Sequence, residues 1–469
     1  MPLRHRSGVE HASALYNVHR EHIDAVPILP MTAVTVLRSD FLDRTDPTLA
    51  NWCGWLMVAV AASIPLGTAT TNVLGSLLLI ALILAGGYKA HWQRWRAHPF
   101  AIATLVLCAV IFVGISYSNA PTDEIVRALK KYARLLYAPI AIAVLVDGRW
   151  RRRALLAWMA AMLLTLVLSY LHAVWAFPLA RATRENVVGD HFIFKHHITQ
   201  NVMMSVFAVA AFAEAWRLRA NADRRWRIYA WVFIAFAAAI NILFFVWGRA
   251  GYLTLFVNLL VVALVAFVAA RDTRLTWVAG GLIVVAVIAA STSNMVHQRF
   301  QAALSEVESS QERGISTSIG QRMEFASKSV DLIETRPILG WGTGSYAMEY
   351  CRIAKSVEWC KLGAYNPHNQ FLFFAVQFGA LGVFALVGWL ITAGLSLRRI
   401  PLCEQLVGYS VLATLVVHSM LDSPLYIVTE GAWYPLMLGI FAAGAYPQPA
   451  TASSDKARSE TVATDGHSG

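Results

Sequence analysis

The stretch "NPHNQFLFFAVQFGALGVFALVGWLITAG", residues 366–394, joins a polar motif to a long apolar segment. From residue 370 to residue 394 it contains no Asp, Glu, Lys or Arg. A helix needs about 20 apolar residues to cross a bilayer, so this segment is long enough. Lipid offers no hydrogen-bond partners to the backbone, so a spanning segment must be a helix or a strand of a closed barrel. Because the apolar residues are continuous rather than alternating, we predict a helix.

Comparable segments recur along the whole chain. Of its 469 residues, 57% are hydrophobic and only 14% are charged, whereas soluble domains are about a quarter charged. We therefore predict an all-α polytopic membrane protein with about twelve transmembrane helices. The expected spans are residues 52–68, 72–88, 100–117, 132–147, 154–176, 197–216, 228–246, 252–270, 275–291, 370–394, 403–421 and 433–446.

The net charge of +11 predicts an orientation, because short cytoplasmic loops carry an excess of Lys and Arg. Sixteen basic residues fall in one set of loops: Lys89, Arg94, Arg96, Arg149, Arg151, Arg152, Arg153, Arg217, Arg219, Arg224, Arg225, Arg227, Arg271, Arg274, Arg398 and Arg399. Eight fall in the short loops of the other set: Arg127, Lys130, Lys131, Arg134, Arg181, Arg184, Lys195 and Arg249. We expect the first set and both termini to be cytoplasmic.

The chain then divides into segments. We expect a cytoplasmic N-terminal segment (1–51) without a cleavable signal peptide, spans 1–9 (52–291), an outer helical loop (292–367), spans 10–12 (368–446) and a disordered cytoplasmic tail (447–469). The loop contains a helical stretch, "IGQRMEFASKSVDLIETRP", and a turn-rich "GWGTGSY". Its two cysteines, Cys351 and Cys360, form either a disulfide in an oxidising compartment or two reduced thiols.

Charged residues gather on the expected outer side, where charge at membrane depth is costly and usually functional. Arg249 ends a span in "FFVWGRAGY", Arg322 lies in the outer loop, and Asp422 ends a span in "HSMLDSPLY". Arg249 is either an interfacial arginine or a phosphate clamp, since guanidinium offers a planar fork of donors. Asp422 either caps a helix or orients a histidine or arginine.

A basic strip, "IVRALKKYARLLY", occupies residues 125–137. Its Arg127, Lys130, Lys131 and Arg134 recur at helical spacing opposite apolar residues. The strip is typical of an interfacial amphipathic helix, and on the outer face it can also attract a pyrophosphate-bearing lipid.

His368 stands where the apolar helix of residues 370–394 begins. We expect Asn366 to be the N-cap, Pro367 to take the first helical position and His368 to lie in the first turn. The positive end of the helix dipole then disfavours imidazolium, and a neutral imidazole can act as a general base. The alternative is an interfacial histidine bonded to backbone.

We expect no metal site and no cofactor. His191, His196 and His197 in "HFIFKHH" do not match a known spacing of metal-ligating histidines. The chain also lacks a carboxylate pair of the DxD type, a P-loop and a glycine-rich dinucleotide turn. We assign the positive charge to membrane topology and an anionic lipid-linked substrate, and expect no nucleic-acid partner.

Two blocks of sequence resemble the O-antigen ligase/polymerase superfamily. His368, Asn369, Gly379 and Gly382 fit the pattern H-N-x(9)-G-x-x-G, and "GQRMEFASKSVDLIETRPILGWGTGSY" precedes it. The resemblance covers roughly residues 240–430. It implies a bacterial, all-helical, GT-C-like membrane protein with about a dozen spans and one large periplasmic loop, here between spans 9 and 10.

The resemblance also implies a function. Ligases of this superfamily transfer polysaccharide from undecaprenyl pyrophosphate to a lipid A–core sugar at the periplasmic face of the inner membrane, without metal, and so complete lipopolysaccharide. Carried over, His368, Arg249 and Arg322 become catalytic, although Gly248 departs from the commoner serine before the first arginine. The expected substrate-binding residues are Lys130, Lys131, Arg134, Asn369 and Asp422. A polymerase, a protein O-oligosaccharyltransferase and a lipid-linked glycan transporter stay open as alternatives.

Overall fold

The structure, a computed structural model, describes residues 44–219, 225–271, 273–293, 298, 301 and 318–445. Within these ranges the chain is helical, apart from turns and one isolated antiparallel bridge between Thr45 and Gly86. The predicted all-α class is therefore confirmed. Residues 1–43 of the expected N-terminal segment and the whole expected tail lie outside the described residues.

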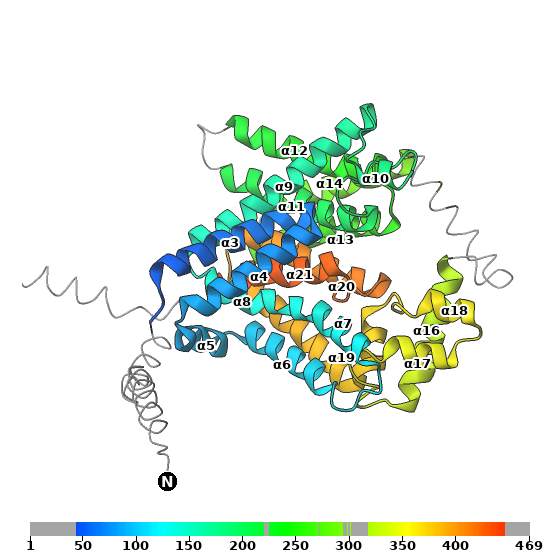
Figure 1. The fold of residues 1–469 in the computed structure, drawn as a ribbon. Coiled ribbons are helices and arrows are strands. Elements are labelled where there is room, and N and C mark those ends of the chain that lie inside the picture. Colours follow the sequence, from blue (N-terminus) through cyan, green and yellow to red (C-terminus); the bar gives the residue numbers. More distant parts are fainter. Residues whose placement is uncertain are drawn as a thin grey trace, which may run out of the picture.

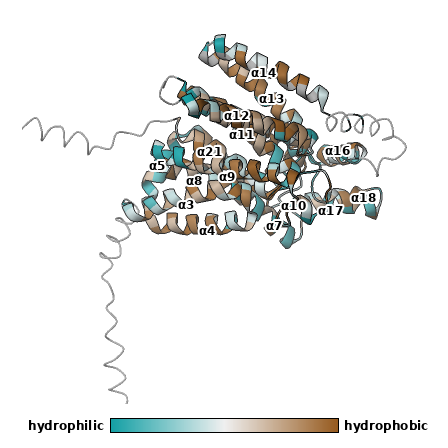
Figure 2. Cartoon of the chain, turned by 90° about the horizontal axis from the view of Figure 1, so that it is seen from above, coloured by the Kyte–Doolittle hydropathy of each residue, from teal (hydrophilic) through white to brown (hydrophobic). Residues whose placement is uncertain are grey.

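Eight helices in the described ranges are long and apolar enough to cross a membrane. Figure 1 shows them running between the two ends of the molecule, and Figure 2 shows hydrophobic residues dominating helices such as α4, α13 and α14. They are α3 (Pro47–Leu66), α4 (Thr68–Ala85), α9 (Gly148–Val174), α11 (His197–Leu218), α12 (Arg225–Phe244), α13 (Arg249–Val265), α19 (Gln370–Leu397) and α20 (Leu402–Leu421). Each corresponds to one predicted span.

The other four predicted spans do not correspond to any of these eight helices. Residues 100–117 become α6 (Pro99–Val113), which bends by 100° from α5 (Tyr88–Ala97). Residues 132–147 hold the end of α7 (Thr122–Tyr132), the 3₁₀ turn η1 (Ala133–Leu136) and α8 (Tyr137–Val144). The predicted span 275–291 becomes α14 (Thr273–Thr292). The predicted span 433–446 becomes α21 (Val428–Ala442), which is buried along most of its length. The total of twelve spans therefore stays a prediction.

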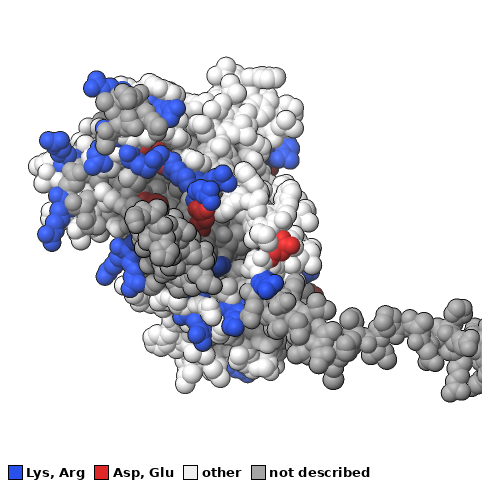
Figure 3. Space-filling model, turned by 90° about the vertical axis from the view of Figure 1, so that its left-hand side faces the viewer, with Lys and Arg blue, Asp and Glu red and all other residues white. Residues whose placement is uncertain are grey.

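The basic loops assigned to the cytoplasm lie at one end of the bundle. There α5 rests on the ends of other helices: Arg94 donates to the carbonyl of Ala143 (2.9 Å) and Trp95 to that of Pro139 (2.8 Å). Figure 3 views this end, and Lys and Arg side chains outnumber acidic ones on it. The described basic residues of the first set therefore lie at a common end of the bundle, in line with the positive-inside trend used to predict the orientation.

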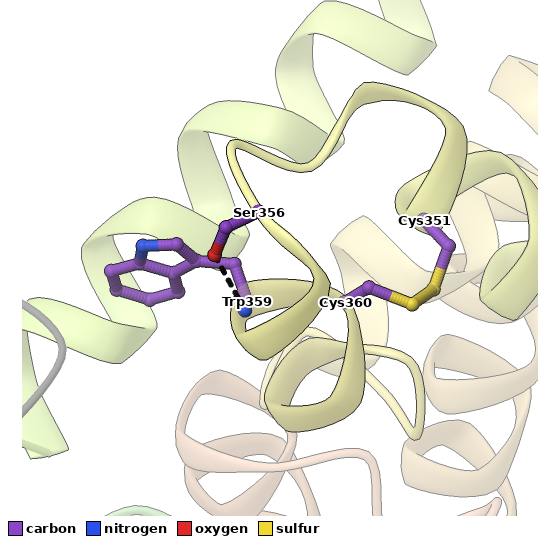
Figure 4. Close-up of a disulfide and its surroundings, with 4 residues drawn as sticks. All are labelled: Cys351, Ser356, Trp359 and Cys360. Carbon is purple, nitrogen blue, oxygen red and sulfur yellow. Dashed lines mark hydrogen bonds between the residues drawn. A yellow bond between two sulfur atoms is a disulfide. The ribbon is translucent and has the colours of Figure 1, made fainter.

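Three helices form a layer at the opposite end (Figure 1). They are α16 (Ser318–Thr335), α17 (Tyr346–Ile353) and α18 (Val357–Gly363). A disulfide between Cys351 and Cys360 joins α17 to α18 (Figure 4). Ser356 caps α18 by accepting a hydrogen bond from the backbone N–H of Trp359 at 3.3 Å. Of the two alternatives for these cysteines, the structure has the disulfide.

Helix α19 is interrupted at Gly379, and the "GWGTGSY" turn fills the interruption. The N–H of Trp341 donates to the carbonyl of Val376 (2.9 Å), and that of Gly342 to the carbonyl of Gln377 (2.7 Å). These carbonyls lose helical partners at the kink, so the turn satisfies them. The two sequence blocks that carry the family resemblance therefore form one structural unit.

Glycine is required at the kink itself. Gly379 has φ +58°, ψ −155°, which residues with a Cβ rarely adopt. A Cβ there would lie 2.3 Å from the carbonyl carbon of Ile338. A Cβ on Gly382 would lie 2.3 Å from Cβ of Phe378. Gly379 thus lets the backbone at Ile338 approach closely, and Gly382 leaves room for the side chain of Phe378.

Candidate active site

A cavity of about 380 Å³ opens at the end of the bundle that carries α16. Its polar walls come from four helices and the residue that follows one of them. They include His197 of α11, Arg249 of α13, Arg322 of α16, His418 of α20 and Asp422 directly after α20. The structure therefore brings together three of the predicted site residues, which lie far apart in sequence.

Arg249 is the first residue of α13, and close packing fixes its position. Gly248 before it has φ +153°. A Cβ on Gly251 would lie 2.7 Å from Cβ of Asn201, so α13 approaches α11 without an intervening side chain. Asn201 also donates to the carbonyl of Val246 at 3.0 Å. The guanidinium thus stands at the positive end of a helix dipole, which favours an anionic ligand.

Arg322 reaches the cavity from α16, the helix predicted in the outer loop. Phe325, one turn further along, is buried and stacks on the ring of His368 with centroids 6.0 Å apart and an interplanar angle of 25°. Residues three apart lie on the same face of a helix. The face of α16 that carries Arg322 is therefore the face that contacts the motif histidine.

His368 lies outside α19, and the expectation that Asn366 caps this helix is wrong. Asn369 is the N-cap: its side chain accepts hydrogen bonds from the N–H groups of Phe371 and Leu372, both at 3.0 Å. Asn366 instead accepts from the N–H of His368 at 2.6 Å, which makes a local turn. His368 consequently sits in the connection with φ +53°, not in the first helical turn. Non-glycine residues in that conformation are uncommon and often functional.

The imidazole of His368 is hydrogen-bonded to Asp422, with 3.2 Å between Nδ1 and Oδ1. Burial raises the pKa of Asp422. Hydrogen bonds from His368 and the Ser423 N–H, together with the charges of His368 and His418, lower it by a larger amount, so the net pKa shift is downward. An ionised carboxylate only accepts hydrogen bonds, so Nδ1–H donates to it, and in the neutral form of the imidazole Nε2 then carries the lone pair. Asp422 also follows the last residue of α20 as its C-cap, so both interpretations of this aspartate apply.

The basic strip lies beside the site loops rather than in the walls of the 380 Å³ cavity. The ammonium of Lys131 sits over the rings of Tyr365 (4.3 Å) and Tyr426 (3.6 Å). Tyr365 directly precedes the motif of His368, and Tyr426 lies four residues after Asp422. Burial, with repulsion from Arg127 and Arg134, lowers the pKa of Lys131 to about 8 despite the opposing effect of Glu124.

The other basic residues of the strip are arranged differently. Arg134 lies 3.5 Å from the amide oxygen of Asn72, Lys130 is exposed, and Arg127 pairs with Glu124 at 2.6 Å. Lys131 is therefore the member of the strip with a direct contact to the site loops in the described part of the chain.

Sequence reasoning missed two histidines of the cavity. His418 is buried, its Nδ1 lies 3.2 Å from the hydroxyl of Tyr434, and its Nε2 has no hydrogen-bond partner in the described ranges. His418 is four residues before Asp422, a helical spacing that could have revealed it. His197 lies 3.5 Å from a carboxylate oxygen of Asp190. Among the residues that the structure describes, no three His, Cys, Asp or Glu side chains group as metal ligands.

Fold and site together define a polytopic membrane protein with an arginine- and histidine-lined cavity at one end. The O-antigen ligase family model (Wzy_C) matches residues 234–387, which are 154 of the 469 residues and include Arg249, Arg322 and His368. This match over a third of the chain is consistent with a member of the O-antigen ligase/polymerase superfamily. No curated protein matches it. Members of this family are glycosyltransferase-like ligases and polymerases, which supports an enzyme that acts on lipid-linked polysaccharide.

Proposed function

We propose that the protein is an O-antigen ligase: an inverting, metal-independent glycosyltransferase at the periplasmic face of the bacterial inner membrane. It moves polysaccharide from undecaprenyl pyrophosphate to a sugar hydroxyl of lipid A–core. One observation carries the proposal. Arg249 and Arg322 line the same cavity as Asp422, and Asp422 accepts a hydrogen bond from His368. This arrangement supports a mechanism in which the arginines stabilise a leaving pyrophosphate while His368 accepts the proton of an attacking hydroxyl.

His368 is the proposed general base. Asp422 holds the Nδ1–H tautomer, so Nε2 takes the proton of the acceptor hydroxyl. The hydroxyl oxygen then forms a bond to the anomeric carbon while the bond from that carbon to the pyrophosphate oxygen breaks. Attack opposite the leaving group inverts the anomeric configuration. Asp422 stabilises the imidazolium that forms, and Phe325 limits the tilt of the ring by stacking on it.

Arg249 and Arg322 are the proposed leaving-group clamp. The pyrophosphate gains negative charge as the glycosidic bond breaks, and preorganised cations lower the barrier most where charge develops. The start of α13 adds its dipole to the charge of Arg249. Removing one such donor typically costs about 10²–10³ in rate.

Two features support the proposed orientation, with the cavity periplasmic and the termini cytoplasmic. The basic loops gather at the end of the bundle opposite the cavity, as expected for the cytoplasmic side (Figure 3). The Cys351–Cys360 disulfide belongs to the layer that covers the cavity end, and disulfides persist in oxidising compartments.

The experiment combines purified protein with defined undecaprenyl-pyrophosphate-linked glycan and each candidate acceptor, and identifies the product by mass. A ligase adds the glycan to lipid A–core. A polymerase lengthens the lipid-linked glycan, a protein O-oligosaccharyltransferase modifies a serine or threonine, and a transporter yields no covalent product. Each of these three outcomes contradicts the ligase assignment.

A further inference from the structure

A second cavity, which we call the inner-end cavity, lies at the opposite end of the bundle from His368. Its volume is about 630 Å³, and it lies between α9, α11, α20 and α21. Its charged residues are Arg151, Arg152, Arg217, Arg219, Glu214 and Glu404. Four arginines against two glutamates leave the cavity with two excess positive charges.

Glu214 already satisfies two of these arginines. Its carboxylate is buried and forms a bidentate pair with Arg152. The same carboxylate accepts from Arg217 at 2.9 and 3.1 Å. This triad is structural, because an unpaired buried Glu214 would be costly. The triad keeps one net positive charge, and Arg151, Arg219 and Glu404 together add a second.

Two buried donors on the cavity wall have no acceptor in the described part of the chain. They are Nε of Arg151 and Nε1 of Trp216. Arg219 lies over the ring of Trp216, with 3.8 Å between its guanidinium carbon and the ring centroid. Buried donors are nearly always satisfied in native proteins. Two such donors beside excess positive charge indicate an anionic ligand with several acceptor oxygens.

The walls of the inner-end cavity change from polar to apolar along the helices. Arg151 and Arg152 lie in the first turn of α9, and Leu155 follows one turn deeper. Ala210 and Ala213 precede the charged last turn of α11 in the same way. A free anion needs only the charged rim, whereas a lipid needs a charged rim and an apolar continuation toward the bilayer.

We propose that the inner-end cavity binds the phosphate-bearing headgroup of an anionic membrane lipid, with Arg151 and Arg219 as its phosphate ligands. Basic pockets between transmembrane helices on the cytoplasmic side suit this chemistry. The site does not depend on the proposed glycosyl transfer, since it shares no residue with the cavity of Arg249 and Arg322.

Native mass spectrometry of the full-length protein tests the proposal. The protein is offered equimolar phosphatidylglycerol and phosphatidylcholine with identical acyl chains. The wild type retains phosphatidylglycerol preferentially, and the double variant Arg151→Gln/Arg219→Gln lowers that retention roughly tenfold, since two charge-assisted hydrogen-bonding groups are lost. The matched control, Arg225→Gln/Arg227→Gln, also removes two positive charges, at the start of α12, and should retain phosphatidylglycerol as the wild type does. Equal retention by all three proteins would overturn the proposal.

A second measurement needs no substitution in the cavity. Cys403 is a free, half-buried thiol on the wall of the inner-end cavity. In a Cys53→Ala/Cys108→Ala background, phosphatidylglycerol vesicles should slow maleimide labelling of Cys403 several-fold relative to phosphatidylcholine vesicles. Inorganic phosphate at millimolar concentration is the third arm. If it protects Cys403 as well as the anionic lipid does, the site takes soluble phosphate and the lipid assignment is wrong.

Discussion

Replacing Asp422 by asparagine removes the charge that faces His368 and keeps the shape of the side chain. Asp422 Oδ1 lies 3.2 Å from Nδ1 of His368 and also accepts from the Ser423 N–H at 2.8 Å. An asparagine oxygen can preserve both hydrogen bonds. The substitution therefore isolates one quantity, the electrostatic stabilisation of the imidazolium that forms as the acceptor hydroxyl loses its proton.

The expected magnitude follows from the distance and the partial exposure of the pair. Two unit charges about 4 Å apart interact by roughly 4 kcal/mol at an effective dielectric constant of about 20. The side chains of Asp422 and His368 are 17% and 34% exposed, so solvent reduces this figure. Partial proton transfer in the transition state reduces it again. A loss of about 2–3 kcal/mol corresponds to a fall in kcat of roughly 30- to 150-fold.

The assay is transfer from a defined lipid-linked glycan to lipid A–core under saturating donor. Asp422→Asn should lower kcat and leave KM for the donor nearly unchanged, because Arg249 and Arg322 still line the cavity. Asp331→Asn is the matched control: Asp331 is half-exposed on α16 and pairs with Lys328 at 2.8 Å. If folded Asp422→Asn protein transfers glycan at the wild-type rate, Asp422 does not act on His368 as argued.

Three further predictions follow from the same structure. Arg322→Lys replaces a two-pronged donor by a point charge and should lower transfer about 10²-fold, whereas Arg336→Lys should not; equal rates would remove Arg322 from the clamp. Gly379→Ala forces an alanine into φ +58° and should lower the melting temperature, with a cost of about 1–3 kcal/mol, whereas Gly388→Ala has open space and should not destabilise. Because the pKa of Lys131 is about 8, its charge disappears as pH rises from 7 to 9, so donor affinity should fall over that interval. Lys131→Arg should abolish this fall, and a pH-independent wild-type affinity would exclude Lys131 from donor binding.

The long apolar helices were predictable because their hydrophobicity does not depend on what surrounds them. Helix α21 was harder: it is short, contains Pro435 and lies almost wholly buried among other helices, so its boundaries reflect packing rather than bilayer thickness. The polar start of α19 shows a different limit. Asn366 and Asn369 are both good capping residues, and only the path of the chain decides that Asn369 caps the helix while Asn366 forms a turn.

Within the site, the residues were easier to predict than their arrangement. Arg249 and Asp422 stood out as charges at span ends and Arg322 as a charge in the outer loop, and the structure places all three around one cavity. His418 did not stand out, because its importance comes from a buried position on the cavity wall. Lys131 was grouped with its neighbours on the strip, but tertiary packing alone sets it over Tyr426.

The most direct test of the account is glycan transfer by purified His368→Ala protein beside the wild type. Both proteins are supplied with undecaprenyl-pyrophosphate-linked glycan and lipid A–core, donor binding is measured separately, and the product is identified by mass. The account predicts that His368→Ala stays folded and binds donor but forms no lipid A–core-linked product. Normal product formation by this variant would show that another group removes the proton, and the proposed mechanism would be wrong.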